Sequence, residues 1–120
     1  MQTILVVEDN KELRENTAEL LQLAGFNVIT STNGEEGLQL TIEQHPDLIL
    51  CDLIMPKAGG MELLQNKKNN NTISDIPLVF LSAGSASFHH HNGFRADGYL
   101  SKPFTYEQLL KTIKQILKKN

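Results

Sequence analysis

Residues 46–52 read Pro46-Asp47-Leu48-Ile49-Leu50-Cys51-Asp52, and this stretch indicates the fold more clearly than any other part of the chain. Its centre is a continuous apolar run without polar alternation, as expected for a strand that is covered on both faces of a parallel sheet. Residues 3–7 and 78–81 have the same character. We therefore expect three strands of this buried kind.

Along the chain, five short β-prone runs alternate with stretches of helical spacing, which predicts a parallel sheet with helices on both faces. The strands are expected at residues 3–7, 27–30, 48–51, 78–81 and 98–100. The helices are expected over residues 13–24, 34–44 and 60–67 and from residue 105 onward. A fourth helix should fall within residues 84–93, but that segment is rich in poor helix formers, so we expect it to be short, irregular or absent.

Two of these helices carry more specific signals. In the second, Leu38 and Ile42 have helical spacing and are expected to face inward. In the last, Thr105 and Gln108 have the spacing of a capping box, in which each side chain satisfies a backbone N–H of the first turn. The last helix therefore has the clearest predicted start.

Length and composition limit the class of protein. The 120 residues predict one domain over residues 1–120, and 11 Lys and Arg against 14 Asp and Glu give a net charge of −3. That acidic balance argues against direct nucleic-acid binding. No apolar run approaches the ~20 residues of a membrane span, and the start lacks the basic leader of a signal peptide. Cys51 is the single cysteine, which excludes an internal disulfide. We expect a small, soluble, cytoplasmic domain.

Polar side chains follow four of the predicted strands. Glu8 and Asp9 come after the first, Asp52 after the third, Ser82 after the fourth and Lys102 after the fifth. Each alone is more simply a turn, a cap or a strand end, but open α/β sheets place their sites where strands end, so the set is expected to converge. Clustered carboxylates favour a hard cation such as Mg²⁺. An aspartate can then act as a nucleophile in phosphoryl transfer, with an ammonium and a hydroxyl contacting the phosphoryl oxygens.

Four ordered segments together resemble the receiver domain of two-component response regulators, over essentially the whole chain. They are ILVVEDN (residues 4–10), PDLILCDLIMP (46–56), LSA (81–83) and ADGYLSKPF (96–104). The resemblance implies a flavodoxin-like, doubly wound (βα)5 fold with five parallel strands in the order 2-1-3-4-5. It also implies a phosphoacceptor signalling domain and not an enzyme, with self-catalysed phosphoryl transfer and autodephosphorylation as its only chemistry.

The resemblance also implies roles for single residues. Asp52 would be the phosphoacceptor, with a sensor histidine kinase or a histidine phosphotransfer protein as the donor. Asp9, Asp52 and the backbone carbonyl of Ile54 would bind Mg²⁺ directly, and Glu8 would act through a metal-bound water. Lys102 would pair with Asp52 before transfer and with the phosphoryl group after it.

The resemblance also implies that phosphorylation changes which partner the domain binds. The resemblance implies that Ser82 moves toward the phosphoryl oxygens and that Tyr99 turns inward into the vacated space. The surface formed by the fourth helix, fifth strand and fifth helix would then change its preference for a downstream protein or a fused output domain. Two alternatives stay open: a phosphate-relay or interaction module that does not switch, and a small-molecule hydrolase or nucleotide-binding enzyme. Against the enzyme, no Gly-rich phosphate loop follows the first strand.

The chain departs from the family pattern at several places. Gly59 stands where a polar residue usually caps the third helix, and the interval from Ser82 to Lys102 is about two residues shorter than usual, which puts the fourth-helix region and its partner surface in question. Within that interval, His89-His90-His91 is more simply an exposed polar stretch than a metal site. Cys51 is expected to be a buried packing group.

Overall fold

The computed structural model describes residues 1–53, 55, 57–82 and 96–119. Within these residues, strands and helices alternate along the chain. In order, the elements are β1 (Thr3–Val7), α1 (Lys11–Leu23), β2 (Asn27–Ser31), α2 (Gly34–Gln44), β3 (Leu48–Asp52), α3 (Gly60–Lys68), β4 (Leu78–Ser82), β5 (Gly98–Ser101) and α4 (Tyr106–Lys119). The predicted fourth helix, residues 84–93 with the three histidines, lies outside the described residues.

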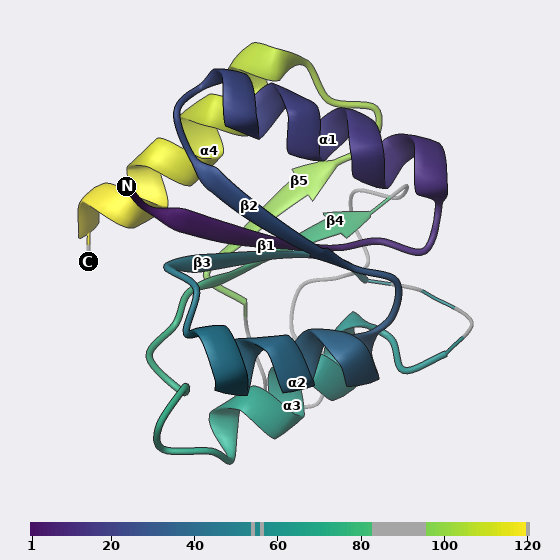
Figure 1. Ribbon diagram of the computed structural model, residues 1–120, viewed down its shortest axis with the longest axis vertical. Coiled ribbons are helices and arrows are strands. Elements are labelled where there is room, and N and C mark those ends of the chain that lie inside the picture. The colour runs from purple at the N-terminus through teal and green to yellow at the C-terminus, as the bar shows by residue number, and fades with distance from the viewer. Residues whose placement is uncertain (54, 56, 83–95, 120) are drawn as a thin grey trace.

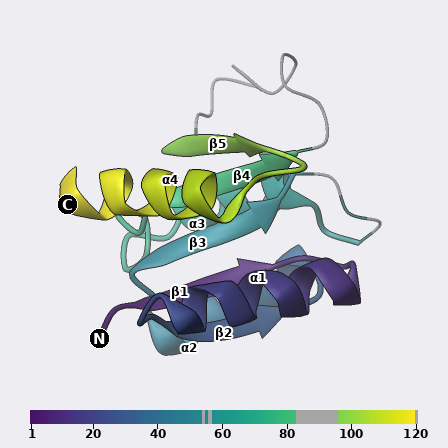
Figure 2. The same cartoon turned by 90° about the horizontal axis from the view of Figure 1, so that it is seen from above.

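The five strands form one parallel sheet in the order β2-β1-β3-β4-β5, which confirms the expected order. Figure 2 shows the strand arrows pointing the same way. Four strands run one residue further than the apolar pattern predicts, because polar residues at their ends still pair in the ladder. Val7 pairs with Ser31, Asp52 with Leu81, and Ser82 with Ser101. Two candidate site residues are therefore the last residues of their strands.

Helices cover both faces of the sheet, as the strand–helix alternation predicts. Helices α1 and α4 lie on one face, and α2 and α3 lie on the other (Figure 1). Side chains of β1 alternate between the two layers. The layer under α1 and α4 includes Ile4, Val6, Leu21, Leu109 and Ile113. The layer over α2 and α3 includes Leu5, Val7, Ile49, Leu63 and Phe80.

Helix α2 packs on the sheet through small residues, and the predicted inward position of Ile42 is wrong. The buried residues of this helix are Gly34, Gly37 and Thr41, and Ile42 is 43% exposed. A Cβ atom built on Gly37 would lie 2.9 Å from the Cγ2 atom of Val7, so the helix approaches β1 too closely for a larger side chain. Successive helical residues are about 100° apart, so the close contact at Thr41 turns Ile42 away from the sheet.

The last helix begins with the capping box that the sequence predicts. The N–H of Thr105 donates to Oε1 of Gln108 over 2.9 Å, and the N–H of Gln108 donates to Oγ1 of Thr105 over 3.1 Å, which is the predicted capping box. Helix α3 begins after Gly59, whose extended backbone makes no side-chain cap. Among the described residues, the helices are all too short or too polar to cross a membrane.

Candidate functional site

The carboxyl ends of β1, β3 and β4 meet at one edge of the sheet. Val7 at the end of β1 pairs with Cys51, and Asp52 at the end of β3 pairs with Leu81. Glu8, which follows Val7, is therefore held beside Asp52. The strand order changes direction between β1 and β3, because β2 lies on one side of β1 and β3 lies on the other side. Open α/β sheets bind ligands at such a switch point.

Three acidic residues gather at this edge. Glu8, Asp9 and Asp52 each offer a carboxylate oxygen, and these oxygens lie within 4.8 Å of one another. Glu8 is 1% exposed and Asp52 is 8% exposed, whereas Asp9 lies at the surface. The N–H of Asn10 donates to Oε2 of Glu8 over 3.2 Å. The cluster therefore has a buried floor and one carboxylate open to solvent.

Lys102 places an ammonium group between the two buried carboxylates. Its backbone N–H donates to the carbonyl of Ser82 over 2.7 Å, which fixes the residue beside the end of β4. Its Nζ atom lies 3.0 Å from Oε1 of Glu8 and 3.2 Å from Oδ2 of Asp52. The structure thus brings together four predicted residues from three distant segments of the chain: Glu8, Asp9, Asp52 and Lys102.

The charges of this cluster do not balance. Burial raises the pKa of Glu8, and the charge of Asp52 adds to the rise, against the hydrogen bonds from Lys102 and Asn10. Burial alone would lower the pKa of Lys102, but its bond to Glu8 and the nearby charge of Asp52 raise it. Three carboxylates face one ammonium, and carboxylate oxygens are hard ligands. The donor set therefore fits a divalent cation such as Mg²⁺.

Ser82 and Tyr99 lie on the neighbouring strands β4 and β5. Ser82 ends β4 and is largely buried. Tyr99 on β5 is half-buried, and its ring is tilted against Phe80 with centroids 6.1 Å apart. Its hydroxyl accepts a hydrogen bond from the N–H of Ala96 over 3.4 Å. Ile54, whose carbonyl was expected to bind the metal, lies outside the described residues.

Cys51, one residue before Asp52, is fully buried in the sheet. Burial raises the pKa of its thiol, so the group stays protonated at neutral pH. Its Sγ atom donates to the carbonyl of Asp52 over 3.4 Å. The expectation of a packing role is in line with this environment.

Arg14 of α1 also contacts the acidic turn, and no sequence motif pointed to it. Its Nη1 atom donates to the carbonyl of Glu8 over 2.9 Å and lies 3.4 Å from the carbonyl of Asp9. The signal in the sequence was its position, one helical turn after the N-cap residue Asn10. Position alone does not reveal such a contact, because the acceptors are backbone groups that every residue carries.

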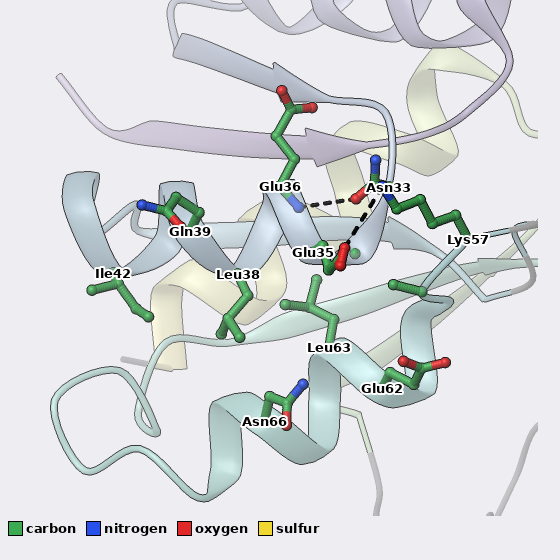
Figure 3. A pocket seen from close by; sticks show the side chains of 12 residues that line it. Asn33, Glu35, Glu36, Leu38, Gln39, Ile42, Lys57, Glu62, Leu63 and Asn66 are labelled. Carbon is green, nitrogen blue, oxygen red and sulfur yellow. Dashed lines mark hydrogen bonds and ion pairs between the residues drawn. The ribbon is translucent and has the colours of Figure 1, made fainter.

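A pocket between α2 and α3 is separate from the acidic cluster (Figure 3). Its volume is about 630 Å³. Leu38 and Leu63 lie between the two helices, and Ile42 lies further along α2. An exposed ion pair of 3.7 Å joins Lys57 and Glu35 at its rim. Residues of the acidic cluster do not line this pocket, so it takes no part in the site described above.

Comparison with known proteins identifies a family. The model of the response regulator receiver domain matches residues 4–114. Protein PilG of Pseudomonas aeruginosa is 34% identical over 113 residues, which cover 92% of this chain and 84% of PilG. The phosphate regulon transcriptional regulatory protein PhoB of the same organism is 32% identical, with 98% of this chain and 52% of PhoB covered. The chain thus spans about half the length of PhoB.

Solved structures agree with the sequence relatives. The chemotaxis response regulator CheY4 of Vibrio cholerae has a TM-score of 0.90 to this chain at 29% identity, covering 97% of this chain and 98% of that one. A protein from Chloroflexus aurantiacus that is described as a putative response regulator has a TM-score of 0.89 to this chain at 30% identity, and the match covers 98% of each chain. The fold and the family are therefore shown by independent comparisons.

Proposed function

Because the chain belongs to the response regulator receiver domain family, whose members are phosphoacceptor signalling domains of two-component systems, we propose that Asp52 accepts the phosphoryl group in this protein. The observation that carries this proposal is the contact of Lys102 with both buried carboxylates, 3.0 Å from Glu8 and 3.2 Å from Asp52. This contact holds Asp52 at the sheet edge with one carboxylate oxygen already next to a cation.

The acidic cluster is the proposed site for Mg²⁺. Asp9 and Asp52 would bind the ion directly, together with the carbonyl of Ile54, and Glu8 would contact it through water. The bound ion would neutralise charge on the phosphoryl oxygens. The excess of carboxylates over ammonium groups at the site and the exposure of Asp9 support this assignment.

In the proposed reaction, a carboxylate oxygen of Asp52 attacks the phosphorus atom of a phosphohistidine. The P–N bond breaks, its electron pair stays with the leaving imidazole, and an acyl phosphate forms on Asp52. Lys102 then moves its ammonium group from Asp52 to the phosphoryl oxygens, and the hydroxyl of Ser82 donates to one of them. Later attack of water returns Asp52 and releases phosphate. The chain would act only on its own phosphoryl group.

The proposed donor is a sensor histidine kinase or a histidine phosphotransfer protein in the cytoplasm. Two shallow pockets flank Lys102 and support this approach. One is lined by residues of α1 with Asn10, and the other is lined by Leu13, Pro103 and Phe104. A donor imidazole has to reach Asp52 beside Lys102, and Lys102 lines both hollows.

The proposed output depends on Ser82 and Tyr99. Phosphorylation adds charge at the edge where β4 ends, and movement of Ser82 toward it would free space beside the tilted ring of Tyr99. We propose that this change alters binding to a downstream protein or a fused output domain.

Acetyl phosphate with Mg²⁺ tests the proposed chemistry in the absence of a kinase. Intact mass spectrometry of the wild-type chain should show one phosphoryl adduct, and the Asp52→Asn variant should show none. Asp75→Asn, which changes an exposed aspartate away from the site, is the matched control and should be labelled like the wild type. No adduct on the wild type, or equal labelling of Asp52→Asn, would contradict the proposal.

A further inference from the structure

The turn that carries Glu8 and Asp9 is bonded to α1 by the N-cap bond between Leu13 and Asn10 and by Arg14, whose side chain reaches the carbonyls of Glu8 and Asp9. The backbone N–H of Arg14 donates to the carbonyl of Asn10 over 2.9 Å, as the first turn of the helix requires. Its side chain reaches back further, with Nη1 2.9 Å from the carbonyl of Glu8 and 3.4 Å from the carbonyl of Asp9. Arg14 therefore contacts three consecutive carbonyl groups of this turn.

The chemistry of arginine suits this contact. Nη1 carries two hydrogen atoms, so it can donate to two neighbouring carbonyls at once, and its positive charge strengthens both bonds. The shorter distance is that of an ordinary hydrogen bond, and the longer one is at the weak end. Lysine offers a more flexible point charge and lacks the planar fork of the guanidinium group.

Glu8 and Asp9 differ in how else they are held. Glu8 is buried, its N–H donates to the carbonyl of Ser31, and its carboxylate accepts from Lys102. Asp9 is exposed, so packing does little to fix the direction in which its carboxylate points. Its backbone carbonyl lies 3.4 Å from the Nη1 atom of Arg14. Because the Asp9 side chain branches from the Cα atom next to this carbonyl, a contact that holds the carbonyl also restricts the direction of the carboxylate.

We propose that Arg14 is a positioning residue that holds the turn so that the carboxylates of Glu8 and Asp9 face Asp52 before a metal ion binds. This inference rests on the proposed function, because it concerns the affinity of that same site for Mg²⁺. Groups that orient metal ligands raise affinity by reducing the cost of ordering the ligands on binding. Loss of the side chain leaves the backbone bond to Asn10 intact, so the helix start survives.

Electrostatics alone predicts the opposite effect. Arg14 adds a positive charge next to an acidic cation site, so its removal would strengthen Mg²⁺ binding if charge were its only influence. A positioning role predicts weaker binding on removal. The direction of the change in affinity therefore separates the two effects.

The test compares Arg14→Ala and Arg14→Lys with wild type and with Lys11→Ala, which removes an exposed cation from the first turn of the same helix. Mg²⁺ affinity is measured by amide NMR titration without phosphodonor, and the Mg²⁺ dependence of labelling by acetyl phosphate is measured separately. Thermal unfolding without Mg²⁺ records whether each variant folds.

Arg14→Ala should weaken Mg²⁺ binding by about tenfold, at the low end of the effects seen when groups that orient metal ligands are removed. The Mg²⁺ concentration for half-maximal labelling should rise by the same factor, and the labelling rate at saturating Mg²⁺ should stay near that of wild type. Arg14→Lys should fall between wild type and Arg14→Ala although its charge is retained. Lys11→Ala should bind Mg²⁺ as well as wild type or better.

Unchanged or tighter binding in Arg14→Ala would overturn the positioning role, even if that variant melted at a lower temperature. If Arg14→Ala does not fold, Arg14→Lys decides, since wild-type affinity in that variant would also overturn the role. A wild-type chain that does not bind Mg²⁺ would contradict the proposed function and this inference with it. If wild type binds Mg²⁺ and Arg14→Ala binds it with the same affinity, the result would contradict this inference but not the proposed function.

Discussion

Lys102 partly neutralises the negative charge of the site. Its ammonium group lies between two largely buried carboxylates, one directly after β1 and one at the end of β3. These residues could be predicted from the sequence because each follows a recognisable strand. Arg14 could not, because it binds backbone carbonyls and its neighbours in the sequence give no sign of that.

Lys102→Met should destabilise the Mg²⁺-free chain at neutral pH by about 1–2 kcal/mol, because it leaves Glu8 and Asp52 facing each other without a cation. Added Mg²⁺ should then stabilise the variant by more than it stabilises wild type. Urea unfolding with and without Mg²⁺ measures both effects. If Mg²⁺ stabilised the two proteins equally, the ammonium group of Lys102 and the metal ion would not be neutralising the same carboxylates.

Glu8→Gln should stabilise the Mg²⁺-free chain at neutral pH, while it weakens Mg²⁺ binding. The pKa of Glu8 in the folded protein is raised above its ordinary value of 4.5, mainly by burial. The stability linked to this group is therefore fully present below pH 4.5 and is lost as the pH rises through the folded-state value. Gln keeps an oxygen that accepts from Lys102 without carrying the buried charge.

The measurement is urea unfolding of wild type and Glu8→Gln between about pH 4.5 and pH 8 in the absence of Mg²⁺. The free energy of unfolding of Glu8→Gln should exceed that of wild type by a margin that grows as the pH rises. A difference in unfolding free energy that stays constant with pH would show that ionisation of Glu8 is not its cause.

Among the elements, α2 shows where an apolar pattern misleads. The pattern marked Ile42 as a core residue, but the helix contacts the sheet through Gly34, Gly37 and Thr41. Hydrophobicity identifies large apolar side chains and does not reveal how closely two backbones approach. The start of α4 was predictable, because its capping box is a local property of a few adjacent residues.

Gly37→Ala should destabilise the protein by about 1–3 kcal/mol, although alanine is ordinarily the better helix former. The added Cβ atom would lie 2.9 Å from Cγ2 of Val7 and 3.3 Å from Oγ of Ser31. Ile42→Ser, on the exposed side of the same helix, should change the free energy of unfolding by less than about 1 kcal/mol. Urea unfolding of both variants checks the pair, and a stabilised Gly37→Ala would show that α2 does not pack this closely on β1.

For the whole molecule, strand–helix alternation predicted a parallel sheet with helices on both faces, and the resemblance to receiver domains supplied the strand order. The site then follows from topology, since parallel order brings residues 8, 52 and 102 to one edge. The output surface could not be derived in the same way. Residues 84–93 carry little helical pattern, and a segment without periodicity gives no physical basis for placing its side chains.

A ligand that binds only the folded chain stabilises the whole domain. Mg²⁺ should therefore raise the unfolding temperature of wild type in a concentration-dependent manner, and it should raise that of Asp9→Asn much less. Ca²⁺, which is larger and less demanding in geometry, tests whether any divalent ion suffices. Scanning calorimetry gives these shifts, and equal shifts in wild type and Asp9→Asn would place the ion elsewhere.

The residue that carries the phosphoryl group decides whether Asp52 is the phosphoacceptor. After labelling with acetyl phosphate and Mg²⁺, borohydride reduction converts an aspartyl phosphate into homoserine, and peptide mass spectrometry then identifies the modified position. Homoserine is expected at position 52 in the wild-type chain, and no such conversion is expected in Asp52→Asn. Homoserine at another aspartate, or a label that resists reduction, would contradict the claim that Asp52 is the phosphoacceptor.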